Sequence, residues 1–153
     1  MLDMDMEIKK KVIQHCLDRV DKRSAEIMKA IQQAEEAIQG ETKSSAGDKY
    51  ETSREMIQQD LDRYHKQLVQ VKKDRIVLQK IELTAREEIG LGAIVLTDHI
   101  TYFIAVSLGQ QAIEGINMMV ISPSSPIGGL LLGNKVGEHI RFNGTTQTIQ
   151  AIH

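Results

Sequence analysis

The sequence is poor in aromatic residues, in cysteine and in long apolar runs. These shortages argue against an aromatic core, an internal disulfide and a membrane-spanning helix. Aromatic residues make up 3% of the 153 residues and tryptophan is absent, so a thick core built on aromatic rings is not expected. The single cysteine, Cys16, has no internal partner for a disulfide, which favours a reducing compartment, the cytoplasm. The first residues lack the apolar core of a signal peptide, and no run of about 18 apolar residues could span a membrane.

The net charge and the missing motifs argue against two classes of function, nucleic-acid binding through bulk charge and enzymatic catalysis. The net charge is −2, so bulk charge does not favour binding to nucleic acid, although Lys and Arg cluster within residues 9–29 and 63–80 with Asp and Glu interspersed. The chain has no Gly-rich phosphate loop, no Walker sequence and no G-x-S-x-G, and its five histidines lack metal-ligand spacing. We therefore expect no self-contained enzyme site.

The first half of the chain has a helical period. Residues 7–38 contain neither proline nor glycine, and apolar residues recur there in alternating steps of four and three, which predicts a long helix with a coiled-coil seam. The seam positions are Ile13, Leu17, Val20, Ser24, Ile27, Ile31, Ala34 and Ile38. A second run begins near Thr52 and fades near Glu88, with Ile57, Leu61, Tyr64, Leu68 and Val71 at the same steps. Together they predict an antiparallel hairpin in which each helix buries its seam against the other.

The second half has a strand period. The segments "LGAIVL", "TYFIAV" and "MMVIS" are rich in apolar and β-branched residues, and Asn143-Gly144 lies between two alternating runs, a strong hairpin signal. "SPSSPIGGLLLG" holds both prolines and predicts a turn followed by a short helix that begins at Ser125-Pro126 and ends at Gly133, with residues 130–132 buried. The predicted class is α+β, with a helical hairpin over residues 1–88 and a small α+β domain over residues 89–153.

An acidic pair stands between the two predicted helices, in "GETKSSAGDKYETSREM". Asp48 and Glu51 have the spacing of a capping box, with Asp48 at the N-cap and Glu51 at the third helical position. The same two carboxylates could share one hard cation such as Mg²⁺, which usually takes one or two protein carboxylates and fills its other positions with water or phosphate oxygens. Alone they would form a weak site, and another molecule would have to supply the remaining ligands.

The order of these parts resembles the bacterial Gre transcript cleavage factors, the GreA/GreB family, over nearly the whole chain. That family carries a Gly-Asp-x-x-Glu-Asn motif at the hairpin tip, and "GDKYET" matches it at Gly47, Asp48 and Glu51, with Thr52 in place of the Asn. The family's Ser-Pro-Ile segment, followed by Leu-x-Gly, is matched by Ser125, Pro126 and Ile127, then by Leu131 and Gly133.

The resemblance implies a mechanism. Gre factors insert their coiled coil into the secondary channel of RNA polymerase, where the acidic tip residues help to hold a Mg²⁺ ion while the polymerase cleaves its own backtracked RNA. Asp48 and Glu51 would have that role here, without a tightly bound cofactor. The FKBP-like C-terminal domain, with its Ser125-Pro126-Ile127 segment, would dock on the polymerase, and basic residues of the hairpin could contact the nascent RNA.

Three alternatives stay open at this stage. The substitution of Thr52 and the unusual "ETKSSA" segment allow a regulator that enters the same channel without stimulating cleavage. A peptidyl-prolyl isomerase would need an aromatic pocket, and the C-terminal half offers only Tyr102, Phe103 and Phe142. A coiled-coil holdase would need apolar residues at the tip, and few are present.

Overall fold

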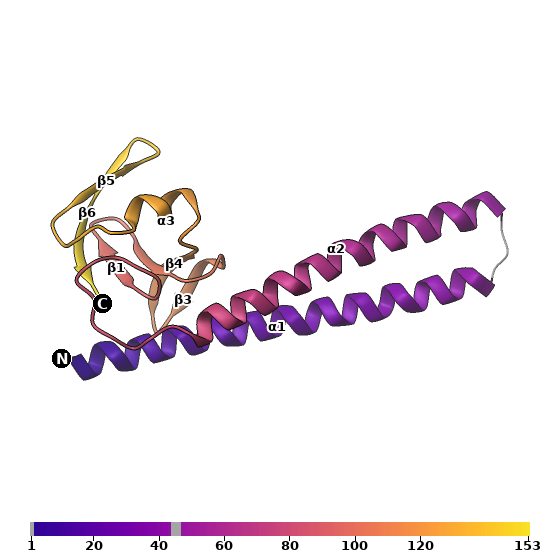
Figure 1. Cartoon of the computed structure of the whole chain (residues 1–153), viewed down its shortest axis with the longest axis horizontal. Coiled ribbons are helices and arrows are strands. Elements are labelled where there is room, and N and C mark those ends of the chain that lie inside the picture. The colour runs from indigo at the N-terminus through magenta and orange to yellow at the C-terminus, as the bar shows by residue number, and fades with distance from the viewer. Residues whose placement is uncertain (1, 44–46) are drawn as a thin grey trace. The chain divides into compact units, whose positions relative to one another are not determined.

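The computed structural model describes residues 2–43 and 47–153, with side chains for residues 6–40 and 51–153 (Figure 1). Two long helices, α1 (Leu2–Lys43) and α2 (Gly47–Gln79), precede six strands and one short helix, so the predicted α+β class is confirmed. The chain forms two compact units: residues 18–76, the hairpin unit, and residues 1–17 with 77–153, the sheet unit. The domains expected at residues 1–88 and 89–153 stay a prediction.

The hairpin unit consists of the facing parts of α1 and α2, which run antiparallel (Figure 1). The expected seam residues Val20, Ile27 and Leu61 are buried, and Leu68 is half-buried. Seam positions nearer the end of α1, such as Ile31, are only half-buried. The tightest packing between the helices therefore lies farther from the end of α1. Each helix therefore hides its apolar stripe within the hairpin unit, as the heptad steps predict.

The helix bounds differ from the predicted ones. α1 extends beyond residues 7–38 at both ends, and α2 begins at Gly47 instead of near Thr52. The added segments, such as residues 2–6 and 47–51, do not continue the alternating steps of four and three, so the apolar pattern could not detect them. α2 ends at Gln79 rather than near Glu88, because residues 81–86 have no regular structure and Glu88 forms an isolated bridge with Lys135.

The sheet unit is built on one six-stranded sheet. Its strands are β1 (Ile94–Thr97), β2 (Thr101–Ile104), β3 (Gly109–Ile113), β4 (Ile116–Ile121), β5 (His139–Phe142) and β6 (Thr145–Ile152). Their order is β3-β4-β2-β1-β6-β5, and only β2 and β4 pair in parallel. The turn at Asn143-Gly144 joins β5 to β6, which confirms the predicted hairpin.

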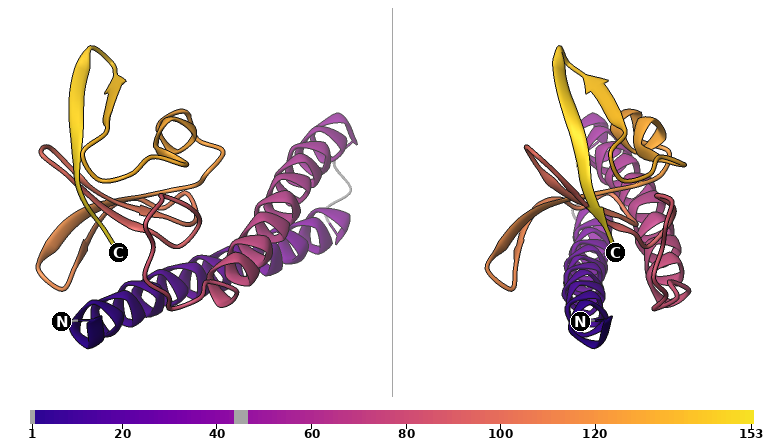
Figure 2. Two further views of the ribbon diagram at one scale, coloured as in Figure 1. Left: turned by 60° about the vertical axis from the view of Figure 1, so that its left-hand side comes forward. Right: turned by 90° about the vertical axis from the view of Figure 1, so that its left-hand side faces the viewer.

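One face of the sheet packs against α3 (Pro126–Leu131), which lies over that face in Figures 1 and 2. Leu131 is completely buried there in a cluster with strand residues that include Val95 and Ile104, and Ile127 packs against the cluster. Leu130 and Leu132 are 45% and 39% exposed, so the expectation that residues 130–132 are all buried is wrong. A helix this short turns only one side chain in three or four toward the sheet.

The other face of the sheet is covered by the first turns of α1, which belong to the same unit. Lys9, Val12 and Cys16 are all at most 2% exposed and are spaced three and four residues apart, so they share one side of the helix. Ile13 and Leu17, the predicted seam residues, are only half-buried. Here the fully buried side lies one residue earlier than predicted, because it packs against the sheet, whereas Ile13 and Leu17 line an open pocket together with Leu78 at the end of α2.

Candidate functional site

The acidic pair lies at the beginning of α2. Because α2 begins at Gly47, Asp48 occupies its first turn, and the described chain is helical on both sides of residues 44–46. The turn expected between residues 40 and 56 is therefore much shorter, and Asp48 follows the first helical residue instead of preceding the helix as an N-cap would. The side chain of Asp48 lies outside the described residues.

Glu51 is exposed and lies three residues after Asp48, so the two positions share one face of α2. Carboxylates near a helix N-terminus are stabilised by the partial positive charge of the free N–H groups. Among the side chains that the structure describes, no three Asp, Glu, His or Cys residues gather closely enough to hold a metal ion. Two carboxylates are the kind of ligand that a hard cation such as Mg²⁺ prefers. The remaining ligands of the ion would be oxygen atoms of water or of another molecule.

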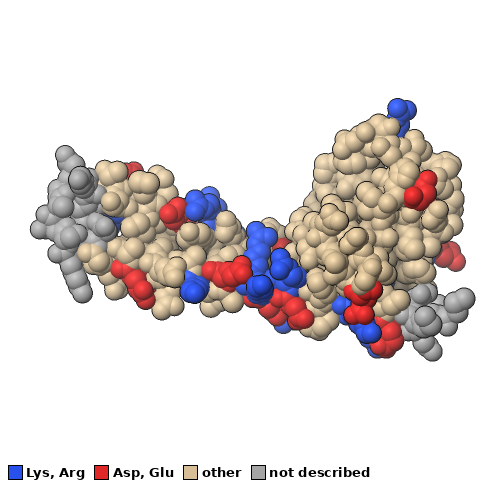
Figure 3. All heavy atoms as spheres, turned by 180° about the vertical axis from the view of Figure 1, so that it is seen from behind, with Lys and Arg blue, Asp and Glu red and all other residues tan. Residues whose placement is uncertain are grey.

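The surface of the hairpin unit carries both signs of charge. On the face seen in Figure 3, Lys and Arg side chains alternate with Asp and Glu along the helices. Arg75 pairs with Asp21 on the opposite helix, and Arg63 pairs with Asp60 at 3.1 Å and lies over the ring of Tyr64. Two basic residues of the hairpin unit are thus paired with acidic neighbours, and the face seen in Figure 3 does not carry a continuous basic track of the kind that binds RNA non-specifically.

The Ser-Pro-Ile segment, residues 125–127, forms the beginning of α3. The hydroxyl of Ser125 accepts a hydrogen bond from the Gly128 N–H at 3.0 Å and donates one to the Ser122 carbonyl at 2.8 Å. Ser125 is therefore the N-cap of α3, and Pro126 follows at the first helical position, where no N–H is required. The prediction that Ser125-Pro126 opens a short helix is confirmed, whereas a docking role for Ser125, Pro126 and Ile127 stays a prediction.

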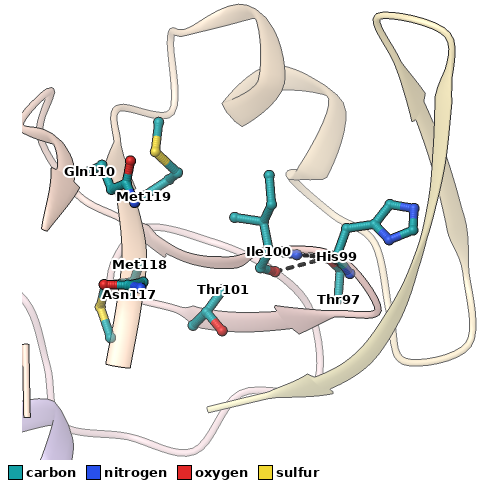
Figure 4. Close-up of a pocket in the computed structure, with 8 residues that line it drawn as sticks. All are labelled: Thr97, His99, Ile100, Thr101, Gln110, Asn117, Met118 and Met119. Carbon is teal, nitrogen blue, oxygen red and sulfur yellow. Dashed lines mark hydrogen bonds between the residues drawn. The ribbon is translucent and has the colours of Figure 1, made fainter. Parts of the chain in front are cut away.

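A polar pocket in the sheet unit was not predicted from the sequence. It encloses about 320 Å³ and is lined by Thr97, His99, Ile100, Thr101, Gln110, Asn117, Met118 and Met119 (Figure 4). These residues come from the β1–β2 turn and from the β3–β4 hairpin, so only the sheet register brings them together. The lining contains no Phe, Tyr or Trp, because Phe103 is buried and Tyr102 is turned into the core, where its hydroxyl donates to Gln147 at 3.0 Å.

Two buried titratable groups also escaped sequence reasoning. Burial, together with the nearby positive charge of Arg86, lowers the pKa of the Lys9 ammonium to about 8. Burial raises the pKa of the Cys16 thiol to about 12, so the thiol is protonated and unreactive at neutral pH. In the part of the chain that the structure describes, neither long helix has an apolar stretch that could cross a membrane.

Comparisons with known proteins add one observation. A scan against protein-family models and a search of curated proteins both found no match. Among solved structures, the chain is similar to one described as "Structure of the transcription factor Gfh1", with 21% sequence identity, coverage of 90% of this chain and 93% of that chain, and a TM-score of 0.36. A likeness at that score is too weak to assign a fold or a function.

Proposed function

We propose that this chain is a transcription factor of the Gre type, which binds RNA polymerase and places the acidic pair of α2 in the polymerase secondary channel. Asp48 and Glu51 would then help to hold a Mg²⁺ ion at the polymerase active site. In a two-metal site such an ion stabilises the attacking and leaving oxygens of phosphodiester hydrolysis. The cleavage of backtracked RNA would belong to the polymerase, so this chain would stimulate a reaction without being the enzyme.

One observation carries the proposal: Asp48 and the exposed Glu51 share a face of α2 at the connected end of a helical hairpin. Two carboxylates on one helix leave most positions of a Mg²⁺ ion to other ligands, so the ion would be held firmly only where a partner supplies them. The resemblance of "GDKYET" and of the Ser-Pro-Ile segment to the Gre motifs supports RNA polymerase as that partner.

A second candidate is a regulator that enters the same channel without stimulating cleavage. The observation that favours it is Thr52, which stands where the Gre motif has Asn. Both candidates require binding to RNA polymerase, and they differ only in what the acidic pair does after binding. Preference for short or longer RNA fragments, as in GreA or GreB, stays open.

The test uses two nearly isosteric changes, Asp48→Asn and Glu51→Gln, with Glu55→Gln as the control. Cleavage of RNA in stalled elongation complexes from the same organism should be lost in the first two variants and retained in the control. Binding to the polymerase should be unchanged in all three. Equal cleavage by the parent and the amide variants would remove the metal-holding role, and a parent that binds without stimulating cleavage would establish the regulator.

A purely helix-starting role predicts a different result. Amide side chains keep the hydrogen-bonding capacity needed at a helix N-terminus and lose only the charge, which is worth about 0.3–1 kcal/mol there. Under that role the amide variants would show a slightly lower melting temperature and unchanged cleavage. Thermal unfolding of each variant therefore accompanies the cleavage assay.

A further inference from the structure

Two cationic side chains lie close together within the sheet unit. Lys9 belongs to the first turns of α1 and is 2% exposed, and Arg86 belongs to the irregular segment after α2 and is half-buried. The two are near enough for the charge of Arg86 to contribute to the lowered pKa of Lys9. We call this pair, with the main-chain oxygen of His153 that accepts from Lys9, the Lys9–Arg86 site.

Hydrogen-bond donors outnumber acceptors in this site. The ammonium of Lys9 has three N–H donors, and the guanidinium of Arg86 has five. Among the residues whose side chains are described, the acceptor found for these donors is the His153 oxygen, 3.2 Å from Lys9 Nζ. Arg86 Nε is sealed from solvent and has no partner in that part of the chain. A charged donor that is buried without a partner is costly, so the site lacks an acceptor.

Release of the Lys9 proton does not remove this deficit. It cancels one positive charge, but the guanidinium of Arg86 stays protonated at any physiological pH, and Nε remains a donor. A water molecule would accept from Nε and would leave the charge of Arg86 uncompensated. An anion supplies both the acceptor and the negative charge that the site lacks.

Gly90 helps to position the guanidinium. A methyl group at this residue would lie 3.0 Å from Arg86 Nη1, closer than side-chain carbons normally come to another atom. Because Gly90 has no side chain, the guanidinium can lie against the main chain there. Residues 81–86 have no regular structure, so no helix or strand fixes Arg86, and this contact helps to set its direction.

We propose that the Lys9–Arg86 site binds a phosphate group, with the guanidinium of Arg86 donating to two of its oxygens and the ammonium of Lys9 to a third. Arg presents a planar fork that matches two oxygens of a phosphate, whereas Lys acts as a point charge. A phosphate dianion balances both positive charges. A carboxylate balances only one of them, and chloride lacks oxygens in the geometry of the fork.

A bound phosphate would connect parts of the chain that are far apart in sequence. Lys9 lies in α1, Arg86 follows α2, and His153 follows β6. The ion would therefore stabilise the packing of the first turns of α1 in the sheet unit, because only the folded chain brings these groups together.

The experiment titrates sodium phosphate into the ¹⁵N-labelled full chain at pH 7, with sodium chloride of equal ionic strength as the reference. Phosphate should cause saturable amide shifts around Lys9, Arg86 and Gly90, and chloride should not. Lys9→Met and Arg86→Met should each weaken phosphate binding at least about tenfold, the loss expected for a charge-assisted hydrogen bond. Lys10→Met is the matched control, because Lys10 is exposed, and it should bind phosphate as the parent does.

Two further arms separate the sources of the phosphate group and test a competing carboxylate. Glycerol 3-phosphate that binds as tightly as inorganic phosphate would identify a phosphate ester as an occupant, and weaker binding would identify the free ion. Asp5 stands four residues before Lys9 in α1, and its side chain lies outside the described residues. Phosphate binding that appears in Asp5→Asn and not in the parent would mean that Asp5 fills the site, which would overturn the proposal.

Three other results would also overturn it. They are shifts no larger than those with chloride, shifts centred away from the Lys9–Arg86 site, and affinity that either methionine variant leaves intact. If the spectrum of Arg86→Met shows unfolding, Gly90→Ala provides the second variant, because its methyl group displaces the guanidinium and keeps the charge. Full affinity for phosphate in Gly90→Ala would then contradict the role of the Arg86 fork.

Discussion

The ammonium of Lys9 donates a hydrogen bond at 3.2 Å to the main-chain oxygen of His153, 144 positions further along the chain. Lys9 is 2% exposed, and no side-chain carboxylate pairs with it among the described residues. Desolvation of the Lys9 ammonium is costly, and Arg86 adds repulsion, so the pKa of Lys9 falls to about 8.

Lys9 gives the stability of the chain a measurable pH dependence. The folded chain releases the Lys9 proton near pH 8, but the unfolded chain retains it until near pH 10.5. Between these values the unfolded state binds more protons, so the free energy of unfolding rises with pH. For Lys9 alone the rise should reach about 2 kcal/mol between pH 7 and 9.5.

Urea unfolding at these two pH values, with Lys9→Met and Lys10→Met as a matched pair, measures the effect. Lys9→Met should lose the rise, whereas Lys10→Met should keep it, because Lys10 is exposed. A rise of equal size in the parent and in Lys9→Met would show that another group titrates.

Cys16 should be inert in the folded chain. Its side chain is fully buried, and its thiol has a pKa of about 12, so both access and thiolate are lacking at pH 8. Alkylation by iodoacetamide should be at least about a hundredfold slower in buffer than in concentrated guanidinium chloride. Fast labelling in buffer would mean that the first turns of α1 leave the sheet readily.

The two adjacent glycines of α3 should respond oppositely to alanine. A methyl group at Gly128 would lie 2.2 Å from the main-chain oxygen of Ser122, whereas one at Gly129 would approach nothing closer than 4.0 Å. Gly128→Ala should therefore lower the free energy of unfolding by about 2 kcal/mol or more, and Gly129→Ala should raise it by up to about 1 kcal/mol. Similar melting temperatures for both variants would contradict this close approach.

Leu131 and Leu130 provide a second matched pair in the same helix. Leu131 is completely buried and Leu130 is 45% exposed. Leu131→Ala should cost about 2–4 kcal/mol through lost apolar burial and a cavity, whereas Leu130→Ala should change stability by about 0.5 kcal/mol or less. Chemical denaturation distinguishes the two, and a large loss for Leu130→Ala would mean that an additional contact covers it.

Local signals in the sequence predicted much of the fold. The heptad steps predicted the hairpin, Asn143-Gly144 predicted the β5–β6 turn, and Ser125-Pro126 predicted the start of α3. Each signal depends on residues close together in sequence, such as a cap or a tight turn. The strand β3 was missed because "GQQAI" has little β-branched character and forms a strand through its pairing with β4.

The parts that could not be predicted depend on distant residues. Nothing near Lys9 in the sequence distinguishes it from the exposed Lys10, because its neighbours in the fold, Arg86 and His153, lie more than seventy residues later in the chain. The polar pocket likewise follows from the pairing of β2 with β4, which no local pattern encodes. For the acidic pair, the spacing of Asp48 and Glu51 and the exposure of Glu51 could be predicted from local residues, while the role of the pair stays a prediction.

The place of β6 in the sheet has a consequence for synthesis on the ribosome. β6 lies between β1 and β5, so β5 joins the rest of the sheet only through the strand that follows all five others in the chain. Until β6 emerges, β1 has one free edge and β5 has no neighbour in the sheet. A nascent chain arrested before residue 145 would expose an open, apolar strand edge, which is the form most prone to aggregate or to recruit a chaperone.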